Sequence, residues 1–231
     1  MSMMNPEIFN RTGLLIGNDN LEKLNNSGVI VFGIGGVGGY AAEALVRSGV
    51  GRLAFVDGDR VSETNLNRQI VAFKSTLGMN KAEVMKRRAL DINPDADVTA
   101  YDLFYDESTE DLIDLSCWDH IIDAIDSVGS KLLLIENAQK AGVPIISCMG
   151  AGNKTDPTAF KAADIYKTSM CPLARTMRRE LKIRGIEKLK AVYSTEPARS
   201  FNGQIGSLAT VVSAAGMLLA HEVLMELTGR R

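Results

Sequence analysis

The sequence has few cysteines and histidines, and their spacing does not match that of a zinc site. Among 231 residues there are three cysteines and two histidines, with no Cys-x-x-Cys pair. A structural zinc ion needs four ligands, usually in paired spacing, so such a site is not expected. Cys148 ends an apolar strand and is expected to be a buried thiol. Cys171 precedes Pro172 without an identifiable base beside it, which favours packing or capping over the alternative of a reactive thiol.

Strong net charge, a signal peptide and a long apolar run are also absent. The formal net charge of -2 gives no overall attraction to nucleic acid, so any such contact must use a local patch. The N-terminal residues lack a basic start followed by an apolar stretch. The longest apolar segment, residues 205–220, is shorter than the roughly 20 residues of a membrane span and is expected to be a buried helix. A cytoplasmic protein without a membrane partner is therefore expected.

The sequence alternates between strand-like and helix-like segments, with no internal repeats or low-complexity linkers. This alternation predicts an α/β fold, a Rossmann-like, doubly wound and mostly parallel sheet within a single domain spanning residues 1–231. The segment 195–204 is expected to form a mobile loop over the cleft, and strands after residue 158 to extend the same sheet. Strands are expected near residues 29–32, 52–57, 97–102, 118–125, 143–149, 159–164 and 191–194, and helices near 40–46, 81–92, 108–115, 131–141, 172–184 and at the C-terminal end.

A glycine-rich loop joins the first expected strand to the first expected helix. Its glycines are Gly33, Gly35, Gly36 and Gly38. Without Cβ atoms the chain can turn tightly there and approach a ligand, and the helix N-terminus favours an anion. A carboxylate roughly twenty residues further on, Asp57 at a strand end, is placed to hold a ribose hydroxyl. These features fit NAD, FAD or ATP equally well. The alternative is a glycine-rich turn that binds no ligand.

The next segment favours a nucleoside triphosphate over a redox dinucleotide. It contains Asp59, two amides at Asn65 and Gln69, and a cation at Arg68, and Lys81 opens the following helix. Arginine binds phosphate oxygens with two hydrogen bonds and lysine acts as a mobile point charge, so both suit a triphosphate. Either cation alone is better explained as a solvated surface residue, but the combination favours a binding site.

Asp126 and Ser127 follow an apolar strand and precede a helix. In an open parallel sheet, ligands bind beyond the carboxyl ends of the strands, so Asp126 is expected to face the glycine loop. A carboxylate beside a triphosphate is repelled unless a divalent cation lies between them, which predicts a magnesium role for Asp126. The alternative is an N-cap of the following helix, and both roles are compatible.

A cluster of basic residues lies in the expected helix 172–184. Arg175, Arg178, Arg179 and Lys182 are three or four positions apart and would share one face of that helix. Such a face suits a phosphate backbone, with strongly salt-dependent binding. The alternative is an ordinary solvated helix surface.

Together these residues resemble the family of ATP-dependent adenylating enzymes that includes ThiF, MoeB and the ubiquitin-activating enzymes. The resemblance extends from Arg11 to the terminal helix. It implies that Asp57 holds the ribose, that Asn65, Arg68 and Lys81 hold the phosphates, and that Asp126 holds Mg2+. It also implies a homodimer in which Arg11 reaches the γ-phosphate across the interface. The cofactors implied are ATP and Mg2+.

Four further motifs resemble the subgroup of tRNA threonylcarbamoyladenosine dehydratases, which likewise lacks zinc cysteines. They lie at residues 32–40, 122–127, 149–158 and 194–196. The resemblance implies ATP-dependent activation of the carboxylate of threonylcarbamoyladenosine in tRNA, followed by ring closure. The basic residues 175–182 would then bind tRNA, and a sulfur-transfer partner such as a cysteine desulfurase is allowed. Some members of the subgroup have a longer segment with a cysteine after the Ser-Thr-Glu motif. In this sequence the corresponding segment, residues 197–206, is short and has no cysteine.

Two rival functions remain at this point, and a dehydrogenase is a distant further alternative. One is adenylation of the C-terminus of a ubiquitin-like sulfur carrier, although enzymes with that role usually carry two cysteine pairs. Another is a non-catalytic nucleotide-binding module that uses the basic helix for docking. A dehydrogenase is the least favoured, because it leaves Asn65, Arg68 and Lys81 unexplained.

Overall fold

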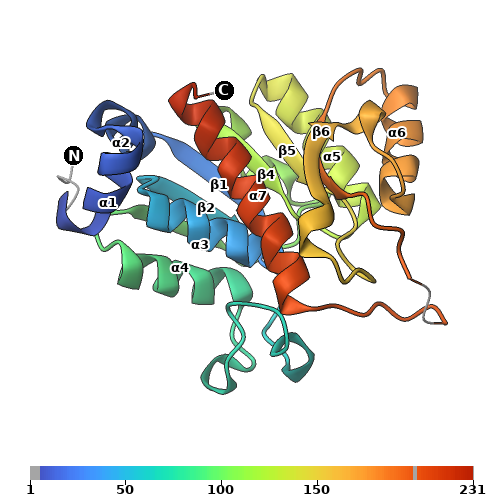
Figure 1. Ribbon diagram of the computed structural model, residues 1–231, viewed down its shortest axis with the longest axis horizontal. Coiled ribbons are helices and arrows are strands. Elements are labelled where there is room, and N and C mark those ends of the chain that lie inside the picture. The colour runs from blue at the N-terminus through green and yellow to red at the C-terminus, as the bar shows by residue number, and fades with distance from the viewer. Residues whose placement is uncertain (1–5, 200–201, 231) are drawn as a thin grey trace.

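The computed structural model describes residues 6–199 and 202–230 and is built around one seven-stranded sheet (Figure 1). The strand order is β3-β2-β1-β4-β5-β7-β6, and every neighbouring pair is parallel except β7 with β6. The predicted mostly parallel sheet, extended by C-terminal strands, is confirmed. The strands are β1 (Gly28–Phe32), β2 (Arg52–Val56), β3 (Asp97–Tyr101), β4 (His120–Asp123), β5 (Ile145–Cys148), β6 (Phe160–Asp164) and β7 (Lys190–Ser194).

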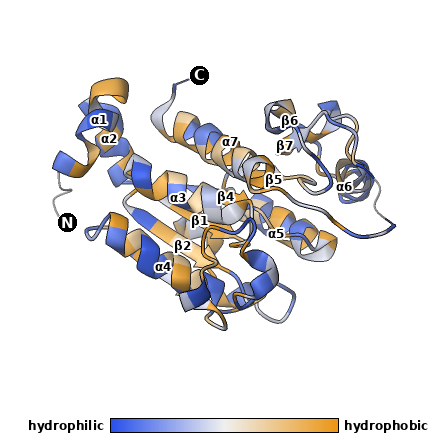
Figure 2. Ribbon diagram, turned by 60° about the horizontal axis from the view of Figure 1, so that its bottom comes forward, coloured by the Kyte–Doolittle hydropathy of each residue, from blue (hydrophilic) through white to orange (hydrophobic). Residues whose placement is uncertain are grey.

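Helices cover both faces of this sheet, as a doubly wound fold requires (Figures 1 and 2). On one face, α3 (Gly38–Ser48), α4 (Lys81–Ile92) and α7 (Ala209–Thr228) bury apolar side chains against alternate residues of the strands. On the other face, α5 (Val128–Ala141) and α6 (Pro172–Ile183) do the same. The central strands β1 and β4 are buried throughout, so β1 is continuously apolar, whereas β4 places its two polar residues, His120 and Asp123, at its ends, where each has a side-chain partner.

Helix α7 packs across α3 and starts beside the glycine loop. A Cβ atom at Gly216 would lie 2.3 Å from the carbonyl oxygen of Val37, so only glycine permits this approach of the two helices. By length and composition α7 is also the one described helix that could cross a membrane. Its contacts with α3, β5, β6 and β7 instead identify it as a helix of the folded core, as predicted, but it spans Ala209–Thr228 rather than residues 205–220, and residues 205–208 are not helical.

Two N-terminal helices, α1 (Pro6–Ile16) and α2 (Asn18–Asn25), were not predicted. Both are short, and they are stabilised by tertiary packing rather than by a strong pattern of their own. Phe9 of α1 and Leu24 of α2 are almost completely buried, and α2 contacts the C-terminal helix. They lie near the edge of the sheet where the strands begin.

The prediction of a helix near residues 108–115 is wrong. This segment contains only two single 3-10 turns, Glu110–Leu112 and Leu115–Cys117. Polar side chains next to the main chain compete with helical hydrogen bonding there. Asp106 accepts from the N–H and hydroxyl of Ser108, and Asp114 accepts from the N–H of Ser116.

A buried ion pair joins the carboxyl ends of β4 and β5. Lys131 Nζ lies 2.9 Å from a carboxylate oxygen of Asp123 at the end of β4 and donates to the carbonyl oxygen of Cys148 at the end of β5, 2.8 Å away. Ser147 completes the network by donating to Asp123. Lys131 and Asp123 are fully buried, so each depends on the other for its charge to be tolerated.

Candidate functional site

A cavity of about 710 Å³ opens over the carboxyl ends of the central strands. This is where open α/β sheets bind ligands, between β1 and β4 where the strand order reverses. The cavity brings together most of the residues predicted from the sequence. Of the predicted nucleotide-site residues, its lining includes Gly33, Gly35, Gly36, Asp57, Asp59, Asn65, Arg68, Gln69, Lys81, Asp126 and Ser127.

The glycine loop presents main-chain donors to this cavity. Gly33 has a φ of 86°, and a Cβ at Gly38 would lie 1.8 Å from the Gly33 carbonyl oxygen, so the tight turn needs both glycines. The N–H groups of Gly35, Gly36 and Val37 donate to no described residue. With the N-terminus of α3 beside them, these three donors form an anion-binding loop.

Asp57 is held by the glycine loop itself. One carboxylate oxygen accepts the N–H of Ile34 at 2.6 Å, and the other accepts the N–H of Asp59 at 2.8 Å. Burial raises the pKa of Asp57, and the charge of Lys81 opposes that rise. The carboxylate keeps unused lone pairs and is fixed at the end of β2, where it can accept a ligand hydroxyl.

Two cations approach the same side of the cavity. Lys81 is 5% exposed, and its ammonium lies 2.7 Å from an Asp59 carboxylate oxygen. The Arg68 guanidinium donates to the carbonyl oxygen of Thr64 and to Asn67, but forms no ion pair with a described residue. Its positive charge is therefore uncompensated on the cavity wall, as an anionic ligand requires.

The two amides of this segment differ in what they do. Asn65 caps a 3-10 turn, because its side-chain oxygen accepts the N–H of Ser62 at 3.0 Å. Gln69 is 8% exposed, and its carbonyl oxygen has no hydrogen-bond partner among the described residues. A buried carbonyl without a donor is costly, which makes Gln69 a candidate for contact with a ligand or water.

Asp126 is exposed at the cavity rim. It forms no hydrogen bond or ion pair with a described residue, and the N-cap of α5 is Ser127, whose hydroxyl accepts from Ser130. The predicted capping role thus belongs to Ser127. Within residues 6–199 and 202–230, no group of three or more histidine, cysteine or acidic side chains gathers as a metal site. A cation at Asp126 would therefore take most of its ligands from a substrate or from water.

The opposite wall of the cavity contains part of the 149–158 motif, but the residues of that motif received no predicted role. It consists of residues 148–154 after β5, the start of α6 and parts of the 198–207 segment. Lys154 brings a cation to this wall and is 4% exposed. Burial raises the pKa of the Cys148 thiol to about 12, so Cys148 stays protonated. Cys171 is also buried and makes no capping hydrogen bond, which agrees with a packing role.

The segment 195–204, expected as a mobile loop, lies partly outside the described residues. Its described part has no helix or strand and is tied to the wall after β5. Asn153, with a φ of 60°, accepts the N–H of Arg199 on its carbonyl oxygen and the N–H of Gly206 on its side chain. Asn153 thus holds the middle of this segment and the residues just after it beside the cavity.

The basic residues do lie on α6, but they differ in exposure. Arg175, Arg179 and Lys182 are exposed, whereas Arg178 is half-buried and donates to Thr168. Arg179 pairs with Glu180 on the surface. Residues 171–173 at the start of α6 line the cavity, so the basic face extends outward from the opening.

Arg11 is the one predicted catalytic residue that the chain keeps away from the cavity. It is exposed on α1, which packs near the C-terminal end of α3, whereas the cavity lies at the N-terminal end of that helix. Arg11 therefore does not line the cavity of its own chain.

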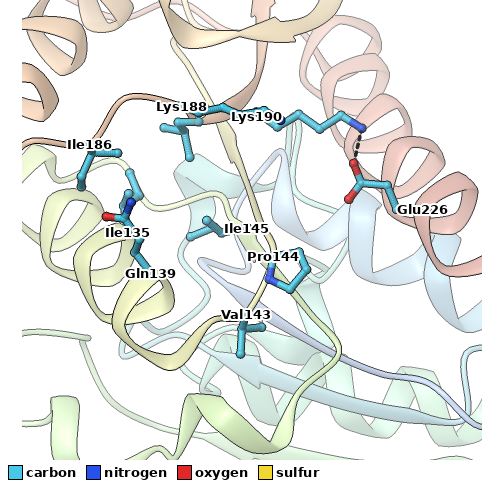
Figure 3. Close-up of a pocket in the computed structure, with 10 residues that line it drawn as sticks. Ile135, Gln139, Val143, Pro144, Ile145, Ile186, Lys188, Lys190 and Glu226 are labelled. Carbon is cyan, nitrogen blue, oxygen red and sulfur yellow. Dashed lines mark hydrogen bonds and ion pairs between the residues drawn. The ribbon is translucent and has the colours of Figure 1, made fainter.

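A smaller cavity of about 280 Å³ lies at the amino ends of the strands, where β5 and β7 begin (Figure 3). Its lining is largely apolar, and Lys190 there is paired with Glu226 and Glu222. Glu226 also contacts the buried His120, and these partners lower its pKa to about 2. The Lys190, Glu226 and His120 side chains thus satisfy one another. Of the charged residues in the lining, only the exposed Lys188 has no ion pair among the described residues.

The residues of the larger cavity are those of an α/β nucleotide-binding enzyme. Its glycine loop and two cations, Arg68 and Lys81, together form a site for an anionic ligand. The ThiF family model matches residues 9–231, and the chain belongs to the ThiF family.

Individual relatives agree with this assignment. The chain is 43% identical over 239 residues to the tRNA threonylcarbamoyladenosine dehydratase of Bacillus subtilis, covering 95% of this chain and 94% of that protein. Among solved structures, it is similar to the tRNA N6-threonylcarbamoyladenosine dehydratase of E. coli, TcdA, in complex with AMP. That likeness has a TM-score of 0.92 and 35% identity, covering 97% and 96% of the two chains. The same enzyme in complex with ATP gives a TM-score of 0.89 at 33% identity, covering 97% of this chain and 95% of that one.

Proposed function

We propose that the protein is an ATP-dependent tRNA threonylcarbamoyladenosine dehydratase, formed by the whole chain as one adenylating domain. The observation that carries this proposal is the juxtaposition, in one cavity, of the glycine loop, Arg68, Lys81 and the free carboxylate of Asp126. Identity of 43% to a dehydratase over almost the full length of both chains supports the choice of substrate.

ATP lies along the wall formed by β1 and β2. The free N–H groups of the glycine loop and the cations Arg68 and Lys81 bind the phosphates, while Asp57 accepts a ribose hydroxyl. Lys81 then exchanges its bond with Asp59 for one with a phosphate oxygen. Asn65 fixes the turn that carries Arg68, and Gln69 offers its unpartnered carbonyl oxygen to the ligand.

Mg2+ is the cation that this site fits. Asp126 has a free carboxylate at the rim, and one carboxylate with phosphate and water oxygens is a common magnesium site. When bound, the ion would reduce the charge on the phosphates that the substrate carboxylate approaches. Ser127 keeps Asp126 in place by capping α5 directly after it.

The reaction then needs two displacements. A carboxylate oxygen of threonylcarbamoyladenosine attacks the α-phosphorus of ATP and expels pyrophosphate, with Arg68 and Lys81 stabilising the charge on the phosphates. An atom of the carbamoyl group attacks the activated carboxyl carbon, closes the ring and expels AMP. Because nucleophile and electrophile belong to one molecule, the protein contributes orientation and exclusion of water, and no protein nucleophile is needed.

The working form is a homodimer in which α1 faces a second copy. Leu14 and Leu15 on this helix are 81% and 79% exposed, which is unusual for adjacent large apolar side chains and suits a protein contact. Arg11 lies on the same helix, one turn away, and would reach the γ-phosphate in the partner's cavity.

The substrate is a tRNA in the cytoplasm, and the exposed basic residues of α6 contact its phosphates. Arg175, Arg179 and Lys182 supply that contact, while Arg178 supports the loop at Thr168. The reaction moves no sulfur atom, so a cysteine desulfurase partner would serve another step or regulation.

Mass spectrometry of tRNA nucleosides tests this function. Incubation of the protein with tRNA, ATP and Mg2+ is expected to lower the mass of threonylcarbamoyladenosine by one water and to yield AMP and pyrophosphate. The same tRNA without ATP is the control. An unchanged nucleoside, together with ATP–pyrophosphate exchange that depends on a ubiquitin-like sulfur carrier, would refute the proposal and select that carrier instead.

A further inference from the structure

The cavity wall after β5 carries a cation that the nucleotide does not account for. Lys154 lines the cavity and is 4% exposed, yet its ammonium donates to a single described acceptor, the main-chain oxygen of Glu196 at 2.5 Å. An ammonium has three N–H donors, so a buried lysine with one bond is far from satisfied. Burying such a charge is costly unless an anion or further acceptors complete it.

The Glu196 carboxylate fills this role only in part. The hydrogen bond from the Asp156 N–H lowers its pKa most and the charge of Lys154 adds to this lowering, but Lys154 and Glu196 form no ion pair among the described residues. The Glu196 side chain accepts the N–H groups of Thr155 and Asp156 at 2.9 Å each and the Thr155 hydroxyl at 3.0 Å. These bonds fix the turn that follows Lys154. Glu196 therefore anchors the loop on which Lys154 stands, and leaves the remaining donors of the ammonium available.

Main-chain donors lie next to Lys154 on the same wall. The N–H groups of Gly150, Ala151 and Gly152 form no hydrogen bond with a described residue, and all three residues line the cavity. These unpaired N–H groups are therefore available as donors to an anionic ligand in the cavity. Gly152 is closely covered, because a Cβ there would lie 2.5 Å from the Ile205 side chain.

The position of this wall suits the carboxylate of the substrate rather than the triphosphate of ATP. β5 is the second neighbour of β1 in the sheet, so its end is roughly 10 Å from the glycine loop. The phosphates already have the donors and cations of the first wall. The reaction also needs a cationic group that binds the attacking carboxylate, because the phosphates repel this carboxylate.

Resting on the proposed function, we infer that Lys154, with the free N–H groups of residues 150–152, binds the carboxylate of the threonylcarbamoyl group and aims one of its oxygens at the α-phosphorus. This loop is thus the part of the site that distinguishes modified from unmodified adenosine, since only the modified base carries a carboxylate. Lys154 acts by binding this group, and it transfers no proton.

Binding of two short anticodon stem-loop RNAs tests this inference, one with threonylcarbamoyladenosine and one with adenosine at the same position. Both are titrated in the presence of α,β-methylene ATP, which cannot be cleaved at the α-phosphorus. The wild type is expected to prefer the modified RNA, and Lys154→Met to lower that preference roughly tenfold or more, as for loss of a hydrogen bond to a charged group. Lys154→Arg should keep most of the preference.

Two controls separate this role from support of the loop. The affinity of Lys154→Met for α,β-methylene ATP should stay within about twofold of the wild type, showing that the cavity is intact. Lys161→Met, an exposed lysine on β6, should change neither reading. A Lys154→Met protein that still prefers the modified RNA as strongly as the wild type would overturn the inference alone. A wild type that binds both RNAs equally and leaves the nucleoside unchanged would overturn the proposed function as well.

Discussion

The two walls of the large cavity present the same kinds of groups in different amounts. The wall at β1 and β2 has three free N–H groups, two cations and two acidic side chains, Asp57 and Asp59. The wall after β5 has three free N–H groups and one cation, Lys154. The difference matches the ligands proposed for them, because a triphosphate carries several charges and must be released, whereas a single carboxylate needs one counter-charge and accurate placement.

The buried pair beneath both walls gives the largest expected effect. Lys131→Met leaves Asp123 charged and unpaired in the core, which should cost about 3–5 kcal/mol of unfolding free energy. Chemical denaturation measures this loss. The double variant Lys131→Met with Asp123→Leu should recover a large part of it, since no buried charge remains. A double variant as unstable as the single one would show that the pair is not the cause.

Removing a cation from the first wall should affect catalysis more than RNA binding. Lys81→Ala is expected to lower kcat for dehydration about 10²–10³-fold, the size typical for losing one donor to a developing charge. Its preference for the modified RNA should persist, which is the reverse of the pattern expected for Lys154→Met. Lys74→Ala, an exposed lysine paired with Glu63, is the control. If Lys81→Ala lost the preference for the modified RNA, the two walls could not have the separate roles proposed for them.

The ion pairs at the amino ends of β5 and β7 should stabilise the fold above about pH 4.5, lose that effect in acid, and leave catalysis unchanged. The pKa of Glu226 is lowered from 4.5 to about 2, by His120 first and by Lys190. A depressed carboxylate pKa stabilises the fold above the unfolded pKa, and this contribution is lost as pH falls from about 4.5 towards 2. With solvent screening included, it amounts to roughly 2 kcal/mol. Denaturation at pH 6 and pH 3 should show a smaller pH dependence for Glu226→Gln than for the wild type.

The smallest effect is expected on the face of α6. Replacing Arg175 and Lys182 together by alanine should weaken tRNA binding equally for modified and unmodified RNA. The slope of log affinity against log salt should fall by roughly 0.7–0.9 for each phosphate contact removed. Lys140→Ala on α5 serves as the matched surface control. An unchanged slope would mean that the tRNA backbone approaches elsewhere.

The first wall could be predicted from the sequence because its residues are close together in the chain. Strand, glycine loop, Asp57, Arg68 and Lys81 occupy one βαβ unit and its extension, where spacing alone fixes the geometry. The prediction of a doubly wound, mostly parallel sheet was confirmed for the same reason, since it depends on local alternation.

The second wall depends on contacts between distant segments, which spacing does not reveal. Lys154 meets Glu196, and Asn153 meets Arg199 and Gly206, only after β5 and β7 have paired. The short helices α1 and α2 escaped prediction because packing stabilises them, and local side-chain bonding kept residues 108–115 from forming a helix.

Tracing a carboxylate oxygen through the reaction tests the central claim most directly. The tRNA is prepared with ¹⁸O in both oxygens of the threonyl carboxylate and incubated with the enzyme, ATP and Mg2+ in unlabelled water. The mass of the released AMP is then measured by mass spectrometry. If the carboxylate attacks the α-phosphorus and leaves with it on ring closure, AMP carries one ¹⁸O atom. Unlabelled AMP, or ADP in its place, would contradict adenylation of the carboxylate.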